Sequence, residues 1–132
     1  MSRAWKIALL VLTFLLLAAI SWSQSTTPSF TAKDKQSIES YYNRVLGTLA
    51  PGSVDRSPFP LGIEKALARG SHIPMQLEKD LEPLPPKLES ELSQLTAGYV
   101  RYKLGRHVVL VKKDDLQISD ILKDVAVKER SR

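Results

Sequence analysis

The middle of the chain repeats one short unit three times. Each unit has an apolar residue and a proline, followed at fixed intervals by an apolar residue, a glutamate and another apolar residue. The three copies begin at Phe59-Pro60, Ile73-Pro74 and Leu84-Pro85. Proline is accepted in the first turn of a helix, and the apolar residues that follow it share one helical face. Each unit therefore predicts a short amphipathic helix, which must pack on other parts of the chain because it is too short to be stable alone.

Residues 1–23 have the three parts of a secretion signal. Arg3 and Lys6 give a basic start, and an apolar stretch at residues 7–20 follows it. Ser21-Trp22-Ser23 then supplies the small residues that a signal peptidase requires. The alternative is a permanent anchor, but the apolar stretch is short against the roughly 20 residues that cross a bilayer. We therefore expect cleavage after Ser23, a mature form without a transmembrane segment, and a periplasmic or secreted location.

Composition limits what the mature protein can be. The chain has 132 residues and no cysteine, which leaves enough for one small domain and excludes disulfides and a cysteine-linked lipid anchor. A core of this size is marginally stable without cross-links, so we expect part of the stability to come from a partner or from self-association. The formal net charge of +5, part of which lies in the signal, is too small to indicate nucleic acid binding.

After a polar leader at residues 24–30, residues 31–95 are predicted to form a helical arm. Thr31 and Asp34 have the spacing of a helix-capping pair. Apolar residues then recur at helical intervals until Pro51-Gly52 ends the pattern. The members of this stripe are Ile38, Tyr41, Tyr42, Val45, Leu46 and Leu49. The arm thus combines one amphipathic helix with the three turns that begin at proline.

Residues 96–125 are predicted to form a small antiparallel β-sheet. The segment 99–104 alternates, Gly105-Arg106 has glycine at the first position of a two-residue turn, and 107–111 is rich in valine. These features indicate a hairpin in which Leu104 pairs with His107. One face of this hairpin then carries Val100, Tyr102, Val109 and Val111. We expect this face to pack on the helical arm, at Leu67, Leu77, Leu81, Leu88 or Leu92.

The segment after the hairpin allows two interpretations. Ile118, Ile121, Leu122 and Val125 have helical spacing, yet a third strand would complete the sheet. Residues 126–132 are predicted to form a solvated tail. The whole pattern is that of an α+β fold, with an N-terminal helix and short proline-initiated helical turns followed by a small antiparallel hairpin or meander.

Charge is unevenly distributed between the arm and the hairpin. Residues 78–91 hold five acids against two bases, and residues 101–113 hold five bases before any acid. We favour the interpretation that the two segments dock on each other within one molecule. In the alternative, the hairpin turns its bases outward to an envelope protein or an anionic envelope surface. That contact surface would consist of Arg101, Lys103, Arg106 and Lys112.

The residues offer little for chemistry. A metal site needs three or four ligands. The candidates in this chain are His72 with nearby Met75, and the distant His107. We expect His107 to be a polar residue at the end of a strand. No nucleophile elbow, phosphate loop or metalloprotease motif occurs in the sequence. We interpret Glu64, Glu78 and Glu89 as solvated or paired with lysine. We therefore assign no catalytic, cofactor-binding or metal-binding residue and predict a protein that is not an enzyme and needs no cofactor.

The chain resembles the RcnB-like family of small bacterial periplasmic proteins, which includes anti-virulence regulators of the CigR-like type. The segments that carry the resemblance are Phe30-Thr31, Ile38 and Tyr41-Tyr42, the turns at 60–70 and Leu84-Pro85-Pro86, and the stretch from Gly98-Tyr99 to Ile121-Leu122. The resemblance implies export to the periplasm and a C-terminal sheet whose last strand is 117–122, and we follow it for that strand. For the branch that gives the family its name, it also implies a part in nickel and cobalt homeostasis, without a ligand motif to transfer.

These observations lead to one functional hypothesis and one alternative. The chain is expected to be a non-enzymatic periplasmic or secreted protein that acts through protein or envelope contacts. The alternative is an accessory protein in nickel and cobalt ion homeostasis.

Overall fold

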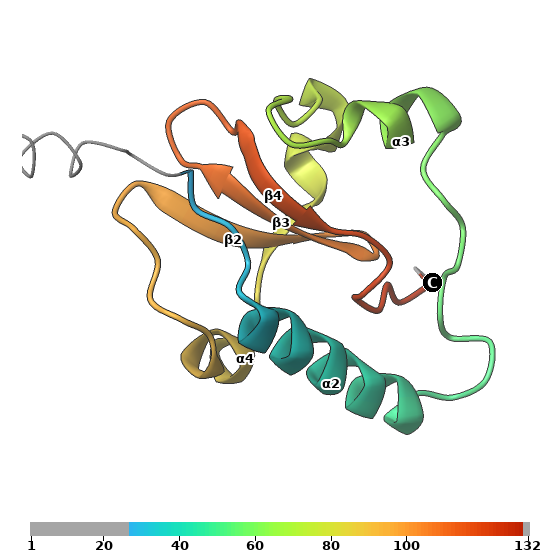
Figure 1. Cartoon of the computed structure of the whole chain (residues 1–132). Coiled ribbons are helices and arrows are strands. Elements are labelled where there is room, and N and C mark those ends of the chain that lie inside the picture. Colours follow the sequence, from blue (N-terminus) through green and yellow to red (C-terminus); the bar gives the residue numbers. More distant parts are fainter. Residues whose placement is uncertain (1–26, 131–132) are drawn as a thin grey trace, which may run out of the picture.

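A four-stranded antiparallel sheet with the order β1-β2-β3-β4 forms the centre of the fold (Figure 1). This computed structural model describes residues 27–130, and the predicted signal sequence and its cleavage site lie outside them. The strands are β1 (Leu81–Pro83), β2 (Tyr99–Leu104), β3 (His107–Lys112) and β4 (Ile118–Leu122). Because neighbours in the sheet are also consecutive along the chain, the sheet is a meander. The predicted α+β class is confirmed.

The helices begin where the sequence places capping residues and prolines. They are α2 (Ala32–Thr48), α3 (Leu61–Ala66), the 3₁₀ helix η2 (Met75–Asp80) and α4 (Pro86–Glu91). The Asp34 amide donates a hydrogen bond of 3.0 Å to the Thr31 hydroxyl at the start of α2. Pro60, Pro74 and Pro85 immediately precede the three short helices in extended conformations. Within residues 27–130, no helix has both the length and the apolar character needed to cross a bilayer.

The β2–β3 hairpin has the predicted register, with Leu104 opposite His107. Gly105 in its turn has a φ of +60°, a conformation that side chains with a Cβ rarely adopt. A Cβ on Gly105 would also lie 2.9 Å from the Phe59 ring. Glycine is therefore required here both by the turn and by the packing of the loop before α3.

Both faces of the sheet are covered. On one face, Val109 and Val111 pack with apolar residues of the segment that contains α3 and η2, including Leu67 and Leu77. On the other face, Val108 packs with side chains of α2 and α4, including Ile38, Tyr42 and Leu88. Figure 1 shows α2 and α4 below the sheet and α3 above it. Of the five leucines expected as alternative contacts of the hairpin face, Leu67, Leu77 and Leu81 are in its cluster. Leu88 and Leu92 pack on the other face, because the chain changes sides of the sheet between the second and third proline units.

This change of sides is made through β1, a strand that the sequence analysis did not predict. Leu81 pairs with Leu104 and Pro83 pairs with Tyr102, so β1 extends the hairpin by one strand. It lies between the second and third proline units, inside the predicted helical arm. Arm and sheet are thus interleaved along the chain.

The segment after the hairpin is a strand, as the family resemblance implied, and its helical spacing is misleading. A register shift between Leu110 and Val111 pairs Leu110 with Asp120 but Val111 with Ile118. This β-bulge lets Ile118 and Ile121 contribute to the same apolar cluster although they are three residues apart. The bulge therefore produces in a strand the spacing that a regular helix shows.

The C-terminal segment is held against the fold as far as the structure describes it. The predicted solvated tail is wrong for residues 126–128, which are covered, whereas Glu129 and Arg130 are exposed but fixed by backbone pairing. Ala126 and Val127 are buried against the α2 side of the sheet. The backbone of this segment pairs with the loop after α2, through Asp55 N–H to Lys128 O (2.8 Å) and Arg130 N–H to Ser53 O (2.7 Å). These hydrogen bonds satisfy polar groups that a free tail would leave to water.

Candidate functional site

Three of the four predicted contact residues are paired within the molecule. The Lys103 ammonium lies 3.5 Å from Glu82, and the Arg106 guanidinium lies 3.3 Å from Asp124. Arg101 is buried, so its assignment to an exposed contact surface is wrong. Only Lys112 of the four is exposed. Glu82, which pairs with Lys103, and Glu89, which pairs with Arg101, both belong to the acidic segment 78–91. These two pairs therefore follow the intramolecular interpretation of the charge pattern.

Arg101 is the centre of a buried ionic cluster between β2, α2 and α4. Its guanidinium donates to a Glu89 carboxylate oxygen at 2.6 Å and to the backbone carbonyl of Ser93, and it lies 3.7 Å from an Asp34 carboxylate oxygen. Asp34, which is 2% exposed, also accepts hydrogen bonds from the amide and hydroxyl of Ser93. The cluster joins the start of α2 to the end of α4 and to the sheet. Arg101 therefore stabilises the fold and is not available to a partner.

His107 is the second buried ionisable group that the fold places against a carboxylate. The Asp124 amide donates a hydrogen bond of 3.0 Å to Nδ1 of His107. Nδ1 therefore carries no proton, and Nε2–H is the donor to Glu64, 3.1 Å away. Glu64 belongs to the first proline unit, so this pair fixes α3 to the start of β3. Glu64 and Glu89 were expected to be solvated or paired with lysine. Instead, Glu64 pairs with His107 and Glu89 pairs with Arg101.

Two carboxyl groups in these clusters have pKa values below the ordinary value. Burial raises the pKa of Asp34, but hydrogen bonds from Ser93 and the charge of Arg101 outweigh it. Burial likewise raises the pKa of Glu64, and the contributions of His107, the Phe59 amide and Lys123 together outweigh it. Both groups thus favour the ionised form in the folded protein.

Folding stability is expected to fall as the pH is lowered through the carboxyl range. A carboxyl whose folded pKa lies below its unfolded pKa stabilises the fold above the unfolded pKa, about 4, and loses that contribution as the pH falls through the folded pKa. Urea unfolding at a series of pH values measures the effect, and Glu64→Gln should show a smaller fall than the natural sequence. An unfolding free energy that is equal at about pH 7 and about pH 3 would contradict this sign.

The candidate metal ligands are not brought together in the described residues. His72 is exposed, and its Nε2 lies 3.4 Å from Asp115. Met75 is 82% exposed at the start of η2, and His107 is buried in its pair with Glu64. Within residues 27–130, no three His, Cys, Asp or Glu side chains are grouped so that they could hold a metal ion.

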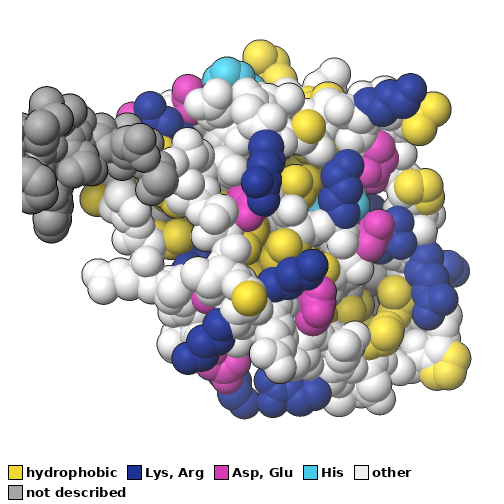
Figure 2. Space-filling model, viewed as in Figure 1, with side chains coloured by type: hydrophobic (Ala, Val, Ile, Leu, Met, Phe, Trp, Pro, Cys, Tyr) yellow, Lys and Arg dark blue, Asp and Glu magenta, His cyan; other side chains and the backbone are white. Residues whose placement is uncertain are grey.

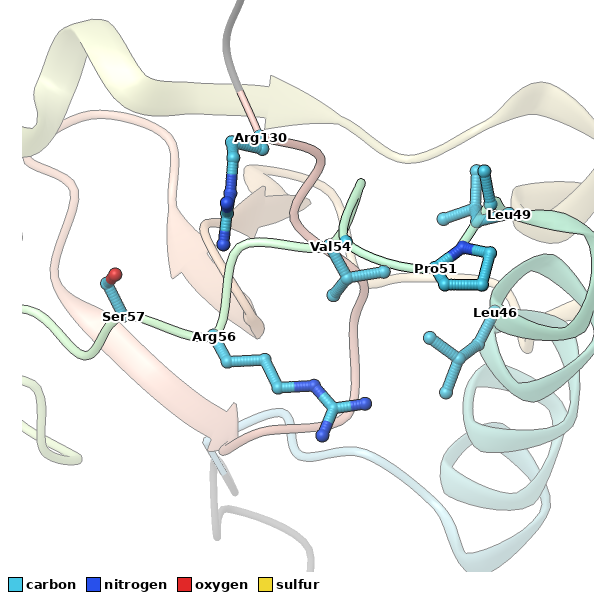
Figure 3. A pocket seen from close by; sticks show the side chains of 9 residues that line it. Leu46, Leu49, Pro51, Val54, Arg56, Ser57 and Arg130 are labelled. Carbon is cyan, nitrogen blue, oxygen red and sulfur yellow. The ribbon is translucent and has the colours of Figure 1, made fainter.

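A surface hollow of about 630 Å³ lies between the end of α2 and the C-terminal segment (Figure 3), and we call it the arginine groove. Helix α2 ends at its C-cap Leu49, and a turn with Gly52 at a φ of +84° redirects the chain. The loop then forms a β-bridge in which Val54 pairs with Glu129 of the C-terminal segment. The groove is lined by Leu46, Leu49, Pro51, Val54, Arg56 and Arg130. Figure 2 shows apolar side chains gathered at the right of this face, with basic side chains beside them.

A second hollow, of about 490 Å³, lies between α2 and β1. Its cations are already paired: Lys103 with Glu82, and Lys128 with Asp55 at 3.3 Å. Its wall also contains Tyr42, whose hydroxyl is buried without a partner in the described structure, and burial raises the pKa of Tyr42 to about 12. Because this hydroxyl is not accessible and the cations of the hollow are paired, the arginine groove is the better candidate for a contact site.

Neither arginine of the groove has a recognisable signal in the sequence. Arg56 lies in a segment without periodicity, and Arg130 in the predicted tail. Leu46 and Leu49 belong to the predicted apolar stripe of the helix, yet Leu46 is 39% exposed. No local signal links Val54 to Glu129, and the groove exists only because these two distant segments pair.

Comparison with known proteins gives a similarity of fold. No family model and no curated protein matches the chain. Among solved structures, the chain is similar to the C-terminal domain of the inner membrane protein CigR from Salmonella enterica, with a TM-score of 0.55 and 21% sequence identity. The match covers 69% of this chain and 84% of that chain. The resemblance to CigR-like proteins is thus confirmed for the fold, and membership of the RcnB-like branch stays a prediction.

Proposed function

We propose that the mature protein is a non-enzymatic protein of the bacterial periplasm, or a secreted one, that acts through contacts with an envelope protein. The observation that carries the proposal is that the buried acidic and basic side chains of the described residues, Asp34, Arg101, His107 and Asp120, are held by partners within the fold. Asp120, for example, accepts from Arg69 Nε at 2.8 Å and from the Phe30 amide at 2.8 Å. Charged groups that are paired in this way stabilise the fold, and the residues that remain for function lie on the surface.

An envelope location has two independent supports. The sequence of residues 1–23 has the pattern of a secretion signal. The fold is shared with a domain of a protein described as an inner membrane protein. The two supports agree on the compartment in which a partner is to be sought.

Export and contact can be tested together in the native host cell. The exported form should begin at Gln24 and lack indole fluorescence, because Trp5 and Trp22 precede the proposed cut. A photoreactive residue at Ser57 or at Lys87, placed in separate experiments, should give a discrete cross-link to an envelope protein. An intact mass that still includes Trp22 would overturn the proposed processing, and the absence of cross-links from both positions would overturn the proposed mode of action.

A part in nickel and cobalt homeostasis is the alternative, and it rests on the resemblance to the RcnB-like family. In the described residues its strongest ligand candidate, His72, has Asp115 as its only ionic neighbour. We expect no tight stoichiometric binding of nickel, cobalt or zinc, because a stable site needs three or four ligands. Calorimetry on the purified, tag-free protein measures this. A submicromolar site that His72→Ala abolishes would favour the alternative over the contact function.

A further inference from the structure

We propose that the arginine groove binds an acidic peptide segment of a protein partner, one that carries apolar side chains next to its carboxylates. The inference rests on the proposed contact function and names the surface and the chemistry of the partner. Carboxylates would pair with Arg56 and Arg130, and apolar side chains would pack against Leu46 and Val54.

The first argument is the state of the two arginines. Neither guanidinium has a carboxylate within 4.0 Å among residues 27–130. The acid next to Arg56 in the sequence, Asp55, is already engaged, because it pairs with Lys128 and accepts from the Ser57 amide. Glu129, next to Arg130, lines the hollow between α2 and β1. Two guanidiniums in one hollow therefore lack a counter-charge in the described structure, and their fork of donors matches carboxylates.

The second argument is the apolar wall beside these charges. Leu46 is 39% exposed on the last turn of α2, although it belongs to a helix whose other apolar residues are mostly covered. Figure 3 shows the Arg56 side chain extending from its loop toward the side of the hollow where Leu46 lies. A ligand that contacts both groups must combine negative charge with an apolar group within a short distance.

The third argument selects a peptide over a lipid. Arg56 and Arg130 come from different segments, joined by the β-bridge between Val54 and Glu129. Two separate cations around an apolar wall match a chain with more than one carboxylate, in which acidic and apolar side chains alternate. The headgroup of phosphatidylglycerol offers one phosphate. The volume of the groove, about 630 Å³, lies within the range of ordinary ligand sites.

The binding is expected to be weak, because exposed ion pairs contribute little each. We expect a dissociation constant of about 0.1–1 mM for a short peptide. The probe is the pentapeptide acetyl-Asp-Leu-Asp-Leu-Asp-amide, followed by amide shifts in NMR of the exported, tag-free protein. Shifts should concentrate in residues 46–57 and 128–130. The matched peptides with asparagine in place of aspartate, or serine in place of leucine, should each bind at least about fivefold more weakly.

The variants that test the groove are surface changes that leave the core intact. Arg56→Gln, Arg130→Gln and Leu46→Ser should each weaken the pentapeptide about fivefold, whereas Lys87→Gln on α4 should not change it. Lack of saturable binding up to about 10 mM, equal binding of the control peptides, or equal binding by the groove variants would overturn the proposal. So would binding to phosphatidylglycerol vesicles, lost in Arg56→Gln, without binding to the peptide.

The outcome separates the groove from the general function. Cross-links from Lys87 but not from Ser57, with no peptide binding, would refute the groove and leave the contact function intact. Peptide binding without envelope cross-links from either position would refute the contact function and leave the groove intact.

Discussion

Replacing Arg101 with alanine is expected to lower the free energy of unfolding by about 3–5 kcal/mol, the usual cost of removing one partner of a buried ion pair. Asp34 would remain 2% exposed without the cation that compensates its charge, and the Ser93 carbonyl would lose its guanidinium donor. Small domains have total stabilities of about 5–15 kcal/mol, so a large part of the stability would be lost. Urea unfolding followed by circular dichroism measures it.

Two further variants identify the cause of this loss. Lys112→Ala removes an exposed cation from the adjacent strand and should change stability by less than about 0.5 kcal/mol. The double variant Arg101→Met with Asp34→Asn removes the buried carboxylate charge together with the cation that compensates it. It should therefore be more stable than Arg101→Met alone. An Arg101→Ala protein as stable as the natural one would show that the buried cluster contributes nothing.

Local signals in the sequence predicted the elements that local interactions determine. The capping of α2 by Thr31 depends on residues within one turn. The hairpin depends on the alternation around Gly105, which fixes the pairing of Leu104 with His107. The proline units likewise mark the starts of three short helices, because proline fixes the backbone before each of them.

The partners of those elements could not be predicted in the same way. Alternation shows that Arg101 and Val109 lie on opposite faces of the sheet, but not that both faces are covered. A strand with one polar face usually has water on that face, so the alternation around Arg101 does not indicate that this side chain is buried. The covering of that face by α2 and α4 depends on β1, which has only three residues and no recognisable pattern.

The candidate site was the least predictable part for a related reason. Its arginines lie in two segments without secondary structure, and backbone hydrogen bonds between Ser53 and Arg130 bring these segments together. Such pairing leaves no periodicity in either segment. The basic residues that do form a visible cluster in the sequence, by contrast, are used mostly for pairs within the fold, such as Lys103 with Glu82.

Replacing Val109 with aspartate is expected to unfold the helices and the sheet in one transition. Val109 is fully buried, and it packs in the cluster that joins the sheet to the α3 and η2 segment. An unpaired carboxylate there costs several kcal/mol, on the order of the whole stability of a small domain. Strand β3 also carries Val108, which contacts the α2 and α4 side, so loss of β3 removes the surface on which both helical layers pack.

The control for this substitution must lie on the surface and carry the same new charge. Lys113→Asp, at the exposed end of the hairpin, should leave stability nearly unchanged. Lys103→Asp is unsuitable as a control because it would place an acid beside Glu82. Far-ultraviolet circular dichroism, read separately for helix and strand during heating, distinguishes the outcomes. Val109→Asp protein that loses only the strand signal and retains its helices on heating would show two independent pieces. Coincident loss of both signals is what a sheet covered on both faces requires, because neither a short proline-started helix nor an isolated hairpin is stable in water.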